Sequence, residues 1–311
     1  MTPERPVNPF FVEPFVSPME PLNPIEHDHD HLYVDVDSSE AQFREFQRQM
    51  GDLTSVINRG RIVLATGHTG CGKSALLNRC AAWVIAGLKE QGKDAKVVDA
   101  SLTFAVSEPT GMVERITTVS DRLFDLMRRE NLIQSTAIEE FRQDRREYVR
   151  VFDNLSFFLP ENNVLILMLP SPEDLWREVV KYASLVRGRV LLMMESSRLD
   201  HEAVQQINVG VERHTKPIVL EVGPLKDGDV KRFVDARLNR QGIPGRFPRM
   251  SDETVVSVGS RMATVAQLQR SMHSTYEFRM RQADYGDDAW VTMEDILADS
   301  ERSSVDGSGA L

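Results

Sequence analysis

The sequence predicts an α/β protein in which a parallel five-stranded sheet is covered by helices on both faces and is followed by a C-terminal all-helical lid. Two observations predict this class. A glycine-rich loop at residues 67–72 joins an apolar run to a helical pattern. Apolar runs then alternate with helical segments as far as residue 225, beyond which no strand pattern follows. We therefore place the core at residues 38–225 and the lid at residues 226–300.

The glycine-rich loop fits G-x-x-x-x-G-K-[ST], the phosphate-binding P-loop, and its flanking strand and helix are the context that supports this motif. Glycines allow backbone conformations that are closed to residues with a Cβ, so successive N–H groups can point at phosphate oxygens. Lys73 is expected to reach the β- and γ-phosphates and to take part in catalysis, and Ser74 is expected to hold Mg²⁺. The expected nucleotide-binding residues are Gly67, His68, Thr69, Gly70, Cys71, Gly72, Lys73, Ser74 and Ala75.

The motif makes the core a P-loop NTPase, with ATP and Mg²⁺ as its expected ligands. Guanine specificity is not expected, because the sequence lacks an N/T-K-x-D signature. A nucleotide kinase is a weaker alternative, since neither acceptor-site residues nor a short phosphate-closing lid can be placed.

Composition narrows the range of functions. The formal net charge of -10 argues against a broad nucleic-acid or membrane footprint. The two cysteines, Cys71 and Cys80, suggest neither a disulfide framework nor a zinc site and favour a reducing compartment. No apolar run is long enough for a membrane span, and no signal peptide is recognised. We expect a cytoplasmic protein.

Residues 1–37 are rich in proline, which disfavours a helix or a central strand. Because phenylalanines are interleaved with the prolines, we expect an extended arm that lies on the globular body. For residues 1–8 a mobile tail is an equal alternative. The run from His27 to His31 alternates histidine with aspartate, and a solvated polar turn is favoured over a metal site.

The core elements follow from apolar periodicity. One helix is expected at residues 40–58, where apolar side chains recur at helical spacing. The five expected strands are residues 61–66, 96–100, 164–169, 189–194 and 217–222. Further helices are expected at residues 74–90, 108–150, 173–186 and 202–208.

In the lid, helices are expected at residues 227–241 and 252–282, and a short final helix begins near residue 292. Residues 301–311 are rich in glycine and serine and are expected to be disordered.

A P-loop on the first strand, five strands and a helical lid together resemble the AAA+ family and the related STAND-type ATPases. Within AAA+, the origin-recognition-like group is the most similar, because an Asn-Pro-Phe segment precedes its core. That segment is Asn8-Pro9-Phe10 in this chain. Gly223-Pro224-Leu225 also resembles the family's junction between core and lid. The resemblance covers residues 8–282, but only the P-loop is specific by itself.

The resemblance implies two acids at the end of the third strand, one for Mg²⁺ and one to activate water. Pro170 and Ser171 stand at those positions, which is a departure from the family. Glu173 and Asp174 follow slightly later and are candidate catalytic acids, although they also suit the start of a helix. Glu195, which ends the neighbouring strand, is a substitute candidate.

The resemblance also implies sensor and finger residues. Ser196 or Ser197 matches the polar residue that orients a water near the γ-phosphate, and Arg213 matches an arginine finger that completes a neighbouring subunit's site. Arg261 or Arg270 is the candidate for the lid arginine that contacts nucleotide.

The leading hypothesis is an ATP-binding AAA+ or STAND-type NTPase that hydrolyses ATP with Mg²⁺ to drive a conformational switch or an assembly step. A regulatory module that binds ATP with little or no hydrolysis is the first alternative, because the third-strand acids are missing. A nucleic-acid-linked loader or transposition ATPase is the second, suggested by basic residues around Lys231 in the lid. We expect a protein partner or self-association; a nucleic-acid partner is not indicated.

Overall fold

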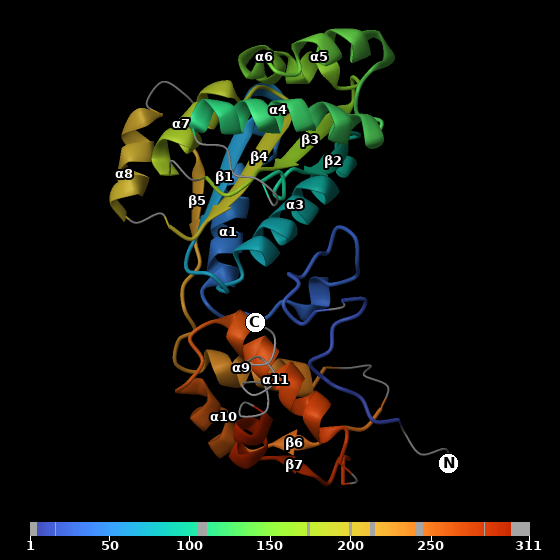
Figure 1. Ribbon diagram of the computed structural model, residues 1–311, viewed down its shortest axis with the longest axis vertical. Coiled ribbons are helices and arrows are strands. Elements are labelled where there is room, and N and C mark those ends of the chain that lie inside the picture. Colours follow the sequence, from blue (N-terminus) through green and yellow to red (C-terminus); the bar gives the residue numbers. More distant parts are fainter. Residues whose placement is uncertain are drawn as a thin grey trace.

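The computed structural model describes residues 5–15, 17–104, 111–172, 175–198, 201–211, 215–240, 245–282 and 284–299. Its centre is a parallel five-stranded sheet in the order β2-β3-β4-β1-β5 (Figure 1). The strands are β1 (Arg61–Thr66), β2 (Asp94–Asp99), β3 (Asn163–Met168), β4 (Val190–Ser196) and β5 (Ile218–Glu221). The predicted α/β class with a parallel five-stranded core is confirmed, and all five expected strands are present within two residues of their expected starts.

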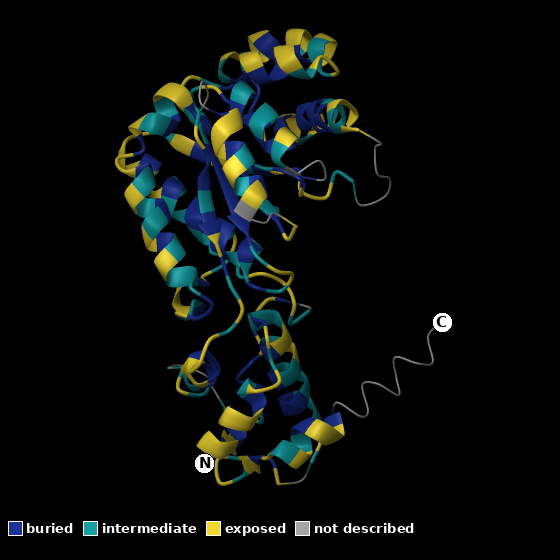
Figure 2. Ribbon diagram, turned by 90° about the vertical axis from the view of Figure 1, so that its left-hand side faces the viewer, coloured by how far each residue is buried: buried dark blue, intermediate teal, exposed yellow. Residues whose placement is uncertain are grey.

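Helices cover both faces of the sheet. Each face of the sheet has its own hydrophobic core, and successive residues of β1 point alternately into the two. Val63 packs in one cluster of buried side chains, and Ile62 and Leu64 pack in the other. The first face is covered by α1 (Ser39–Met50), α2 (Thr54–Arg59) and α3 (Lys73–Glu90). The second is covered by α4 (Met112–Arg129), α5 (Ile138–Asp144), α6 (Tyr148–Phe158), α7 (Leu175–Leu185) and α8 (His201–Gly210). Figure 2 shows the buried strands between helices whose outer sides are exposed.

The expectation of one helix over residues 40–58 was wrong. The chain breaks between α1 and α2, where Gly51 and Leu53 both adopt positive φ angles, of 61° and 64°. This break turns the Leu53 side chain inward, so that it is 2% exposed and packs against Gly87 of α3. Burial of a large apolar side chain therefore offsets the cost of a left-handed leucine.

The helical segment expected at residues 108–150 is also divided. It comprises α4, a short 3₁₀ turn at Ser135–Ala137, α5 and the start of α6. Phe141 of α5 stacks on Phe158 of α6 with ring centroids 4.4 Å apart. These two short helices fold back on each other, which a continuous helix would prevent.

The lid consists of α9 (Asp229–Leu238), α10 (Asp252–Gly259), α11 (Val265–Arg279) and a helical turn at residues 293–299. It is not all-helical as predicted, because β6 (Arg249–Met250) pairs in parallel with β7 (Trp290–Val291). Two residues per strand are too few for a periodic pattern in the sequence. The expected helix at residues 252–282 ends at Gly259, and α11 begins afresh at a new cap.

That cap is Thr264, whose hydroxyl accepts a hydrogen bond from the backbone N–H of Gln267 at 3.3 Å. Thr264→Ala should lower the free energy of unfolding by ~1 kcal/mol and the melting temperature by ~2–4 °C, because the first turn of α11 loses a side-chain acceptor. Thermal unfolding of both proteins would measure this. Thr264→Ser keeps the acceptor and serves as control; an equal loss in both variants would contradict a capping role.

The proline-rich arm lies along the lid and then crosses the waist between lid and core (Figure 1). Phe10 is fully buried, with its ring 5.1 Å from that of Tyr276 in α11. Asn8 donates from its side-chain amide to the carbonyl of His273 at 2.9 Å. The arm therefore helps to form the lid core, as the interleaved phenylalanines suggested, and residues 5–8 are part of this contact. The domain limits at residues 37, 225 and 300 stay predictions.

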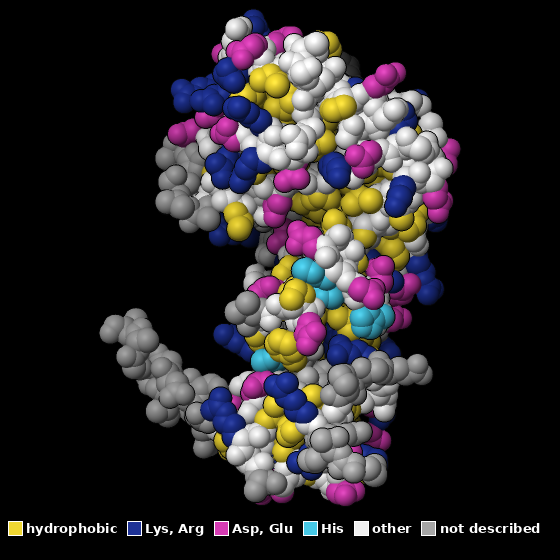
Figure 3. Space-filling view, turned by 90° about the vertical axis from the view of Figure 1, so that its right-hand side faces the viewer, with side chains coloured by type: hydrophobic (Ala, Val, Ile, Leu, Met, Phe, Trp, Pro, Cys, Tyr) yellow, Lys and Arg dark blue, Asp and Glu magenta, His cyan; other side chains and the backbone are white. Residues whose placement is uncertain are grey.

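Histidine side chains gather at the waist of the molecule in Figure 3. His29 is 2% exposed, so the expected solvated turn was wrong for this residue. Its Nδ1 accepts from the Asn23 N–H at 3.1 Å, and its Nε2 donates to the Glu13 carbonyl at 2.8 Å. Both ring nitrogens are therefore used to fold the arm. Within the described ranges there is no group of three or more side chains suited to a metal ion, and no helix long and apolar enough to cross a membrane.

Candidate functional site

The loop between β1 and α3 has the backbone that the motif requires. Gly67, Gly70 and Gly72 all have positive φ angles, of 142°, 85° and 78°. At Gly67 a Cβ would lie 2.1 Å from the Val222 carbonyl oxygen, so no other residue fits without moving the chain. Gly72 directly precedes α3 as its N-cap residue, and the N-terminal end of a helix carries free N–H groups and a positive partial charge. The loop is built to receive an anion.

Lys73 is 5% exposed and its ammonium group lies inside this loop. It donates to the carbonyl oxygens of Gly67 and His68, both at 2.9 Å, and to the Ser197 hydroxyl at 2.8 Å. These neutral acceptors leave the positive charge of Lys73 without a carboxylate partner among its hydrogen bonds. Among the described residues, the lysine therefore brings to the P-loop a positive charge whose hydrogen-bond acceptors are all neutral.

Beside Lys73, the Ser74 hydroxyl donates to Oε2 of Glu195 at 2.7 Å. Glu195 lies near the end of β4, and β4 is the direct neighbour of β1, with Ala65 paired to Glu195. The carboxyl ends of parallel strands meet at one edge of the sheet, which brings this carboxylate to the P-loop. A hydroxyl and a carboxylate oxygen are donors that suit Mg²⁺.

The end of β3 offers no carboxylate at its first two positions after Leu169, which are Pro170 and Ser171. The Ser171 hydroxyl instead donates to the backbone carbonyl of Glu195 at 2.5 Å. This bond ties the end of β3 to the residue that faces Ser74. Glu173 and Asp174, the other expected acids, lie outside the described residues.

The two serines after Glu195 point to different partners. Ser197 accepts the Lys73 hydrogen bond, whereas the Ser196 hydroxyl accepts from the Arg198 N–H at 3.2 Å. Of the two sensor candidates, Ser197 is therefore the one in contact with the P-loop lysine, and the role of Ser196 stays a prediction. Arg213, the expected finger, lies outside the described residues.

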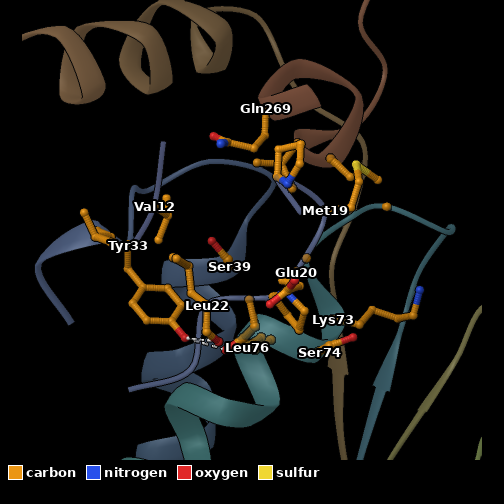
Figure 4. A pocket seen from close by; sticks show the side chains of 18 of the residues that line it. Val12, Met19, Glu20, Leu22, Tyr33, Ser39, Lys73, Ser74, Leu76 and Gln269 are labelled. Atoms are coloured by element: carbon orange, nitrogen blue, oxygen red, sulfur yellow. Dashed lines mark hydrogen bonds between the residues drawn. The ribbon is translucent and has the colours of Figure 1, made fainter. Parts of the chain in front are cut away.

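A cavity of about 380 Å³ extends from the P-loop into the space between core, arm and lid (Figure 4). Lys73 and Ser74 line one side of it, and α11 contributes Gln269 from the lid side. Glu195, which is hydrogen-bonded to Ser74, also lines it. The candidate lid arginines Arg261 and Arg270 do not line it. Arg237 of α9 does, and no pattern in the sequence distinguishes it from its surface neighbours.

The arm forms another wall that sequence reasoning did not find. Tyr33 lines the cavity and donates to the Ala75 carbonyl at 2.8 Å, which fastens the arm to the first turn of α3. Asn78 of the same helix donates to the Leu22 carbonyl at 3.0 Å. The arm therefore joins the P-loop helix to the lid across the cavity.

Asp37 lies where arm, core and lid meet, and it is 2% exposed. Its N–H donates to Oδ2 of Asp229 in the lid at 3.0 Å, and its carbonyl accepts from the Gly223 N–H at 3.1 Å. Burial raises the pKa of the Asp37 carboxyl to about 7, against hydrogen bonds from Ser39 that lower it; the charges of Asp229 and Asp35 raise it further. This carboxyl therefore titrates near neutrality at the edge of the cavity.

Because folding raises the pKa of the Asp37 carboxyl, the folded protein holds this proton more tightly than the unfolded chain does. The free energy of unfolding therefore falls as the pH rises through about 7. On acidification from about pH 8 to pH 6, the wild type should gain ~1.4 kcal/mol in free energy of unfolding relative to Asp37→Asn. Denaturant unfolding of both proteins over this range measures the difference. Parallel pH profiles would contradict a raised pKa at Asp37.

Comparison with known proteins supports the fold. No protein-family model and no curated protein matches the sequence. Among solved structures, the chain is similar to the ORC2 protein of Aeropyrum pernix in its ADPNP–ADP complexes, with 14% identity and a TM-score of 0.52. That match covers 94% of this chain and 71% of the other. It is also similar to the ORC1 protein of the same organism in complex with DNA, with 12% identity, a TM-score of 0.54, and coverage of 88% and 67%.

Proposed function

We propose that this chain, which has the fold of AAA+ ATPases with an origin-recognition-like core, binds ATP and Mg²⁺ in the cavity between core, arm and lid and hydrolyses the ATP. The observation that carries the proposal is the Ser74–Glu195 hydrogen bond beside the buried ammonium group of Lys73. It supplies a carboxylate at the P-loop even though β3 ends without one.

In this proposal the Ser74 hydroxyl and the Glu195 carboxylate hold the metal ion, which would neutralise phosphate charge. Lys73 adds a positive charge from the chain, and the N–H groups of the P-loop add further donors. Glu195 takes the role that the family gives to an acid on β3. Activation of water falls to a second carboxylate, for which Glu173 and Asp174 are the candidates.

The lid would report the nucleotide state. Gly70 and Gly72 of the P-loop lie against Thr264 and Val265 at the start of α11, so a change in the loop reaches the lid directly. The Ala266 N–H also donates to the Gly70 carbonyl at 3.1 Å. ATP binding and hydrolysis would thereby shift the lid relative to the core, which is a conformational switch of the hinge type.

Single-turnover hydrolysis tests the proposal. ATP is mixed with an excess of protein, with Mg²⁺ or with a chelator, and ADP and phosphate are followed over time. Mg²⁺-dependent conversion supports the ATPase. Tight ATP binding without conversion would favour a regulatory module that only binds ATP, which the missing acids of β3 would explain. Failure to bind ATP would contradict both.

Self-association is proposed from the resemblance to AAA+ ATPases, with Arg213 as the residue that completes the site of a neighbouring subunit. The specific rate of hydrolysis measured against protein concentration tests it. A rate that rises with concentration and is lost in Arg213→Ala would support catalysis between subunits, and a constant rate would indicate a monomeric switch.

A further inference from the structure

The end of β3 is joined to β4 by a side chain where a backbone bond would be expected. The N–H of Leu169 donates to the Met193 carbonyl at 2.8 Å. In a parallel ladder the following bond would run from the N–H of Ser171 to the carbonyl of Glu195, two residues further along each strand. The Ser171 hydroxyl donates to that carbonyl instead, at 2.5 Å. A side chain therefore takes the place of one backbone bond of the sheet.

This bond matters because β4 is paired on one side only near its end. The pairing of β3 with β4 ends at Met168 and Met193. The pairing of β1 with β4 continues as far as Ser196 and includes Glu195. On the β3 side, the Ser171 hydroxyl is the group that holds the Glu195 backbone among the described residues. Because the carbonyl belongs to the planar peptide between Glu195 and Ser196, the bond fixes the orientation of that peptide.

The sequence around Ser171 restricts where its hydroxyl can lie. Ser171 stands between Pro170 and Pro172, both of which are buried. A proline has a nearly fixed φ angle and favours an extended conformation in the residue before it. Ser171 itself is exposed, and it is not among the described residues that line the cavity beside Lys73. The serine can therefore act on the site through Glu195 and not by contact with a nucleotide.

A buried arginine holds the backbone of the same serine. Nη2 of Arg115 in α4 donates to the Ser171 carbonyl at 2.7 Å, and its Nε donates to Oε2 of Glu178 in α7 at 3.1 Å. Only 3% of the Arg115 side chain and 1% of the Glu178 side chain are exposed. Apolar side chains often stabilise an interior as well as such a buried ion pair does. What the pair adds here is a fixed donor for the segment that carries Ser171.

We infer that Ser171 is a positioning residue: its hydroxyl holds Glu195 in the place where the carboxylate, together with Ser74, binds the metal ion. The inference rests on the metal site proposed above. A carboxylate that is already held in place loses less conformational freedom when it binds an ion, so its affinity for the ion is higher. Ser171 stands at a position where the AAA+ family has an acid, and in this chain it supports the acid of the neighbouring strand.

Binding of Mn²⁺, used in place of Mg²⁺, tests the inference without hydrolysis. The protein is saturated with an ATP analogue that is not hydrolysed, Mn²⁺ is added, and the free ion is measured by electron paramagnetic resonance. Ser171→Ala should weaken Mn²⁺ binding ~10-fold, because groups that hold a metal ligand in place contribute about this much to metal affinity. Ser171→Thr keeps the hydroxyl and should bind Mn²⁺ within about twofold of the wild type.

Ser101→Ala is the matched control. Ser101 is an exposed serine just after β2, which lies on the other side of β3 from β4, and its replacement should leave the Mn²⁺ affinity unchanged. Glu195→Gln should weaken Mn²⁺ binding at least as much as Ser171→Ala does. Adding Ser171→Ala to Glu195→Gln should cause no further loss, because the serine acts through the carboxylate.

Hydrolysis gives a second measurement. In single-turnover experiments, Ser171→Ala should need ~10-fold more Mg²⁺ for half of the maximal rate, while the maximal rate stays close to that of the wild type. Because Ser171 is exposed, the variant is expected to fold, and its melting temperature should match that of Ser101→Ala. A loss of stability alone would not change the Mg²⁺ requirement in this way.

Two results would overturn the inference and leave the proposed function intact. One is an unchanged Mn²⁺ affinity in Ser171→Ala when Glu195→Gln binds Mn²⁺ weakly. The other is a further ~10-fold loss when the two substitutions are combined, which would indicate that the serine does not act through Glu195. If Glu195→Gln binds Mn²⁺ as the wild type does, the proposed metal site itself is wrong, and the inference falls with it.

Discussion

Replacement of Lys73 by alanine is expected to weaken ATP and ADP binding ~100-fold or more, because hydrogen bonds between an ammonium group and anionic oxygens are among the strongest in proteins. The group is already buried and positioned in the structure, and its present partners are two carbonyls and one hydroxyl. A phosphate is a better acceptor than any of these. Calorimetric titration with ADP and Mg²⁺ measures the effect.

The matched control is Lys89→Ala. Lys89 lies in the last turn of the same helix, and its side chain is exposed. Both variants lose one lysine from α3, but only the first changes the loop. Because Lys73 also holds the Gly67 and His68 carbonyls, circular dichroism and thermal unfolding should establish that the variant is folded. An ADP affinity in Lys73→Ala within about threefold of that in Lys89→Ala would contradict a phosphate-binding role.

The centre of the sheet could be predicted because β1, β3 and β4 are buried on both sides. The residues of β3 from Val164 to Leu167 are completely buried and all apolar. Such a continuous apolar run predicts a buried strand even when the neighbouring strands are unknown. The helix boundaries could not be predicted in the same way. Apolar spacing continues through Gly51 and Leu53, and only the packing of Leu53 against Gly87 shows that the helix must end there.

Part of the candidate site could be predicted from the sequence and part could not. The P-loop is a contiguous motif, so its local backbone follows from adjacent residues. The place of Glu195 depends instead on the strand order, in which β4 and not β3 adjoins β1. Arg237 shows the limit most clearly: it shares α9 with Arg232, whose side chain is 56% exposed, and nothing in the sequence separates the two. Arg237 is 4% exposed and lies over the Phe233 ring, and only the packed lid shows which of the two arginines is buried.

Glu195→Gln is expected to reduce Mg²⁺-dependent ATP turnover ~100-fold or more while ADP affinity changes by only a few fold. The amide keeps the shape of the side chain and an oxygen that can accept from the Ser74 hydroxyl. It cannot supply the negative charge that favours a metal ion beside the phosphates. Single-turnover hydrolysis and ADP titration of the same protein separate the two effects.

The sheet supplies a matched control on the other side of β1. Glu221 is the last residue of β5, just as Glu195 lies near the end of β4. Both strands adjoin β1, in which Thr66 pairs with Glu221 and Ala65 pairs with Glu195. Its side chain is exposed and it does not line the cavity. Glu221→Gln should therefore turn over ATP as the wild type does. If Glu195→Gln retains turnover within about threefold of this control, the metal-binding carboxylate must lie elsewhere, and the acids after β3, Glu173 and Asp174, would be the residues to replace next.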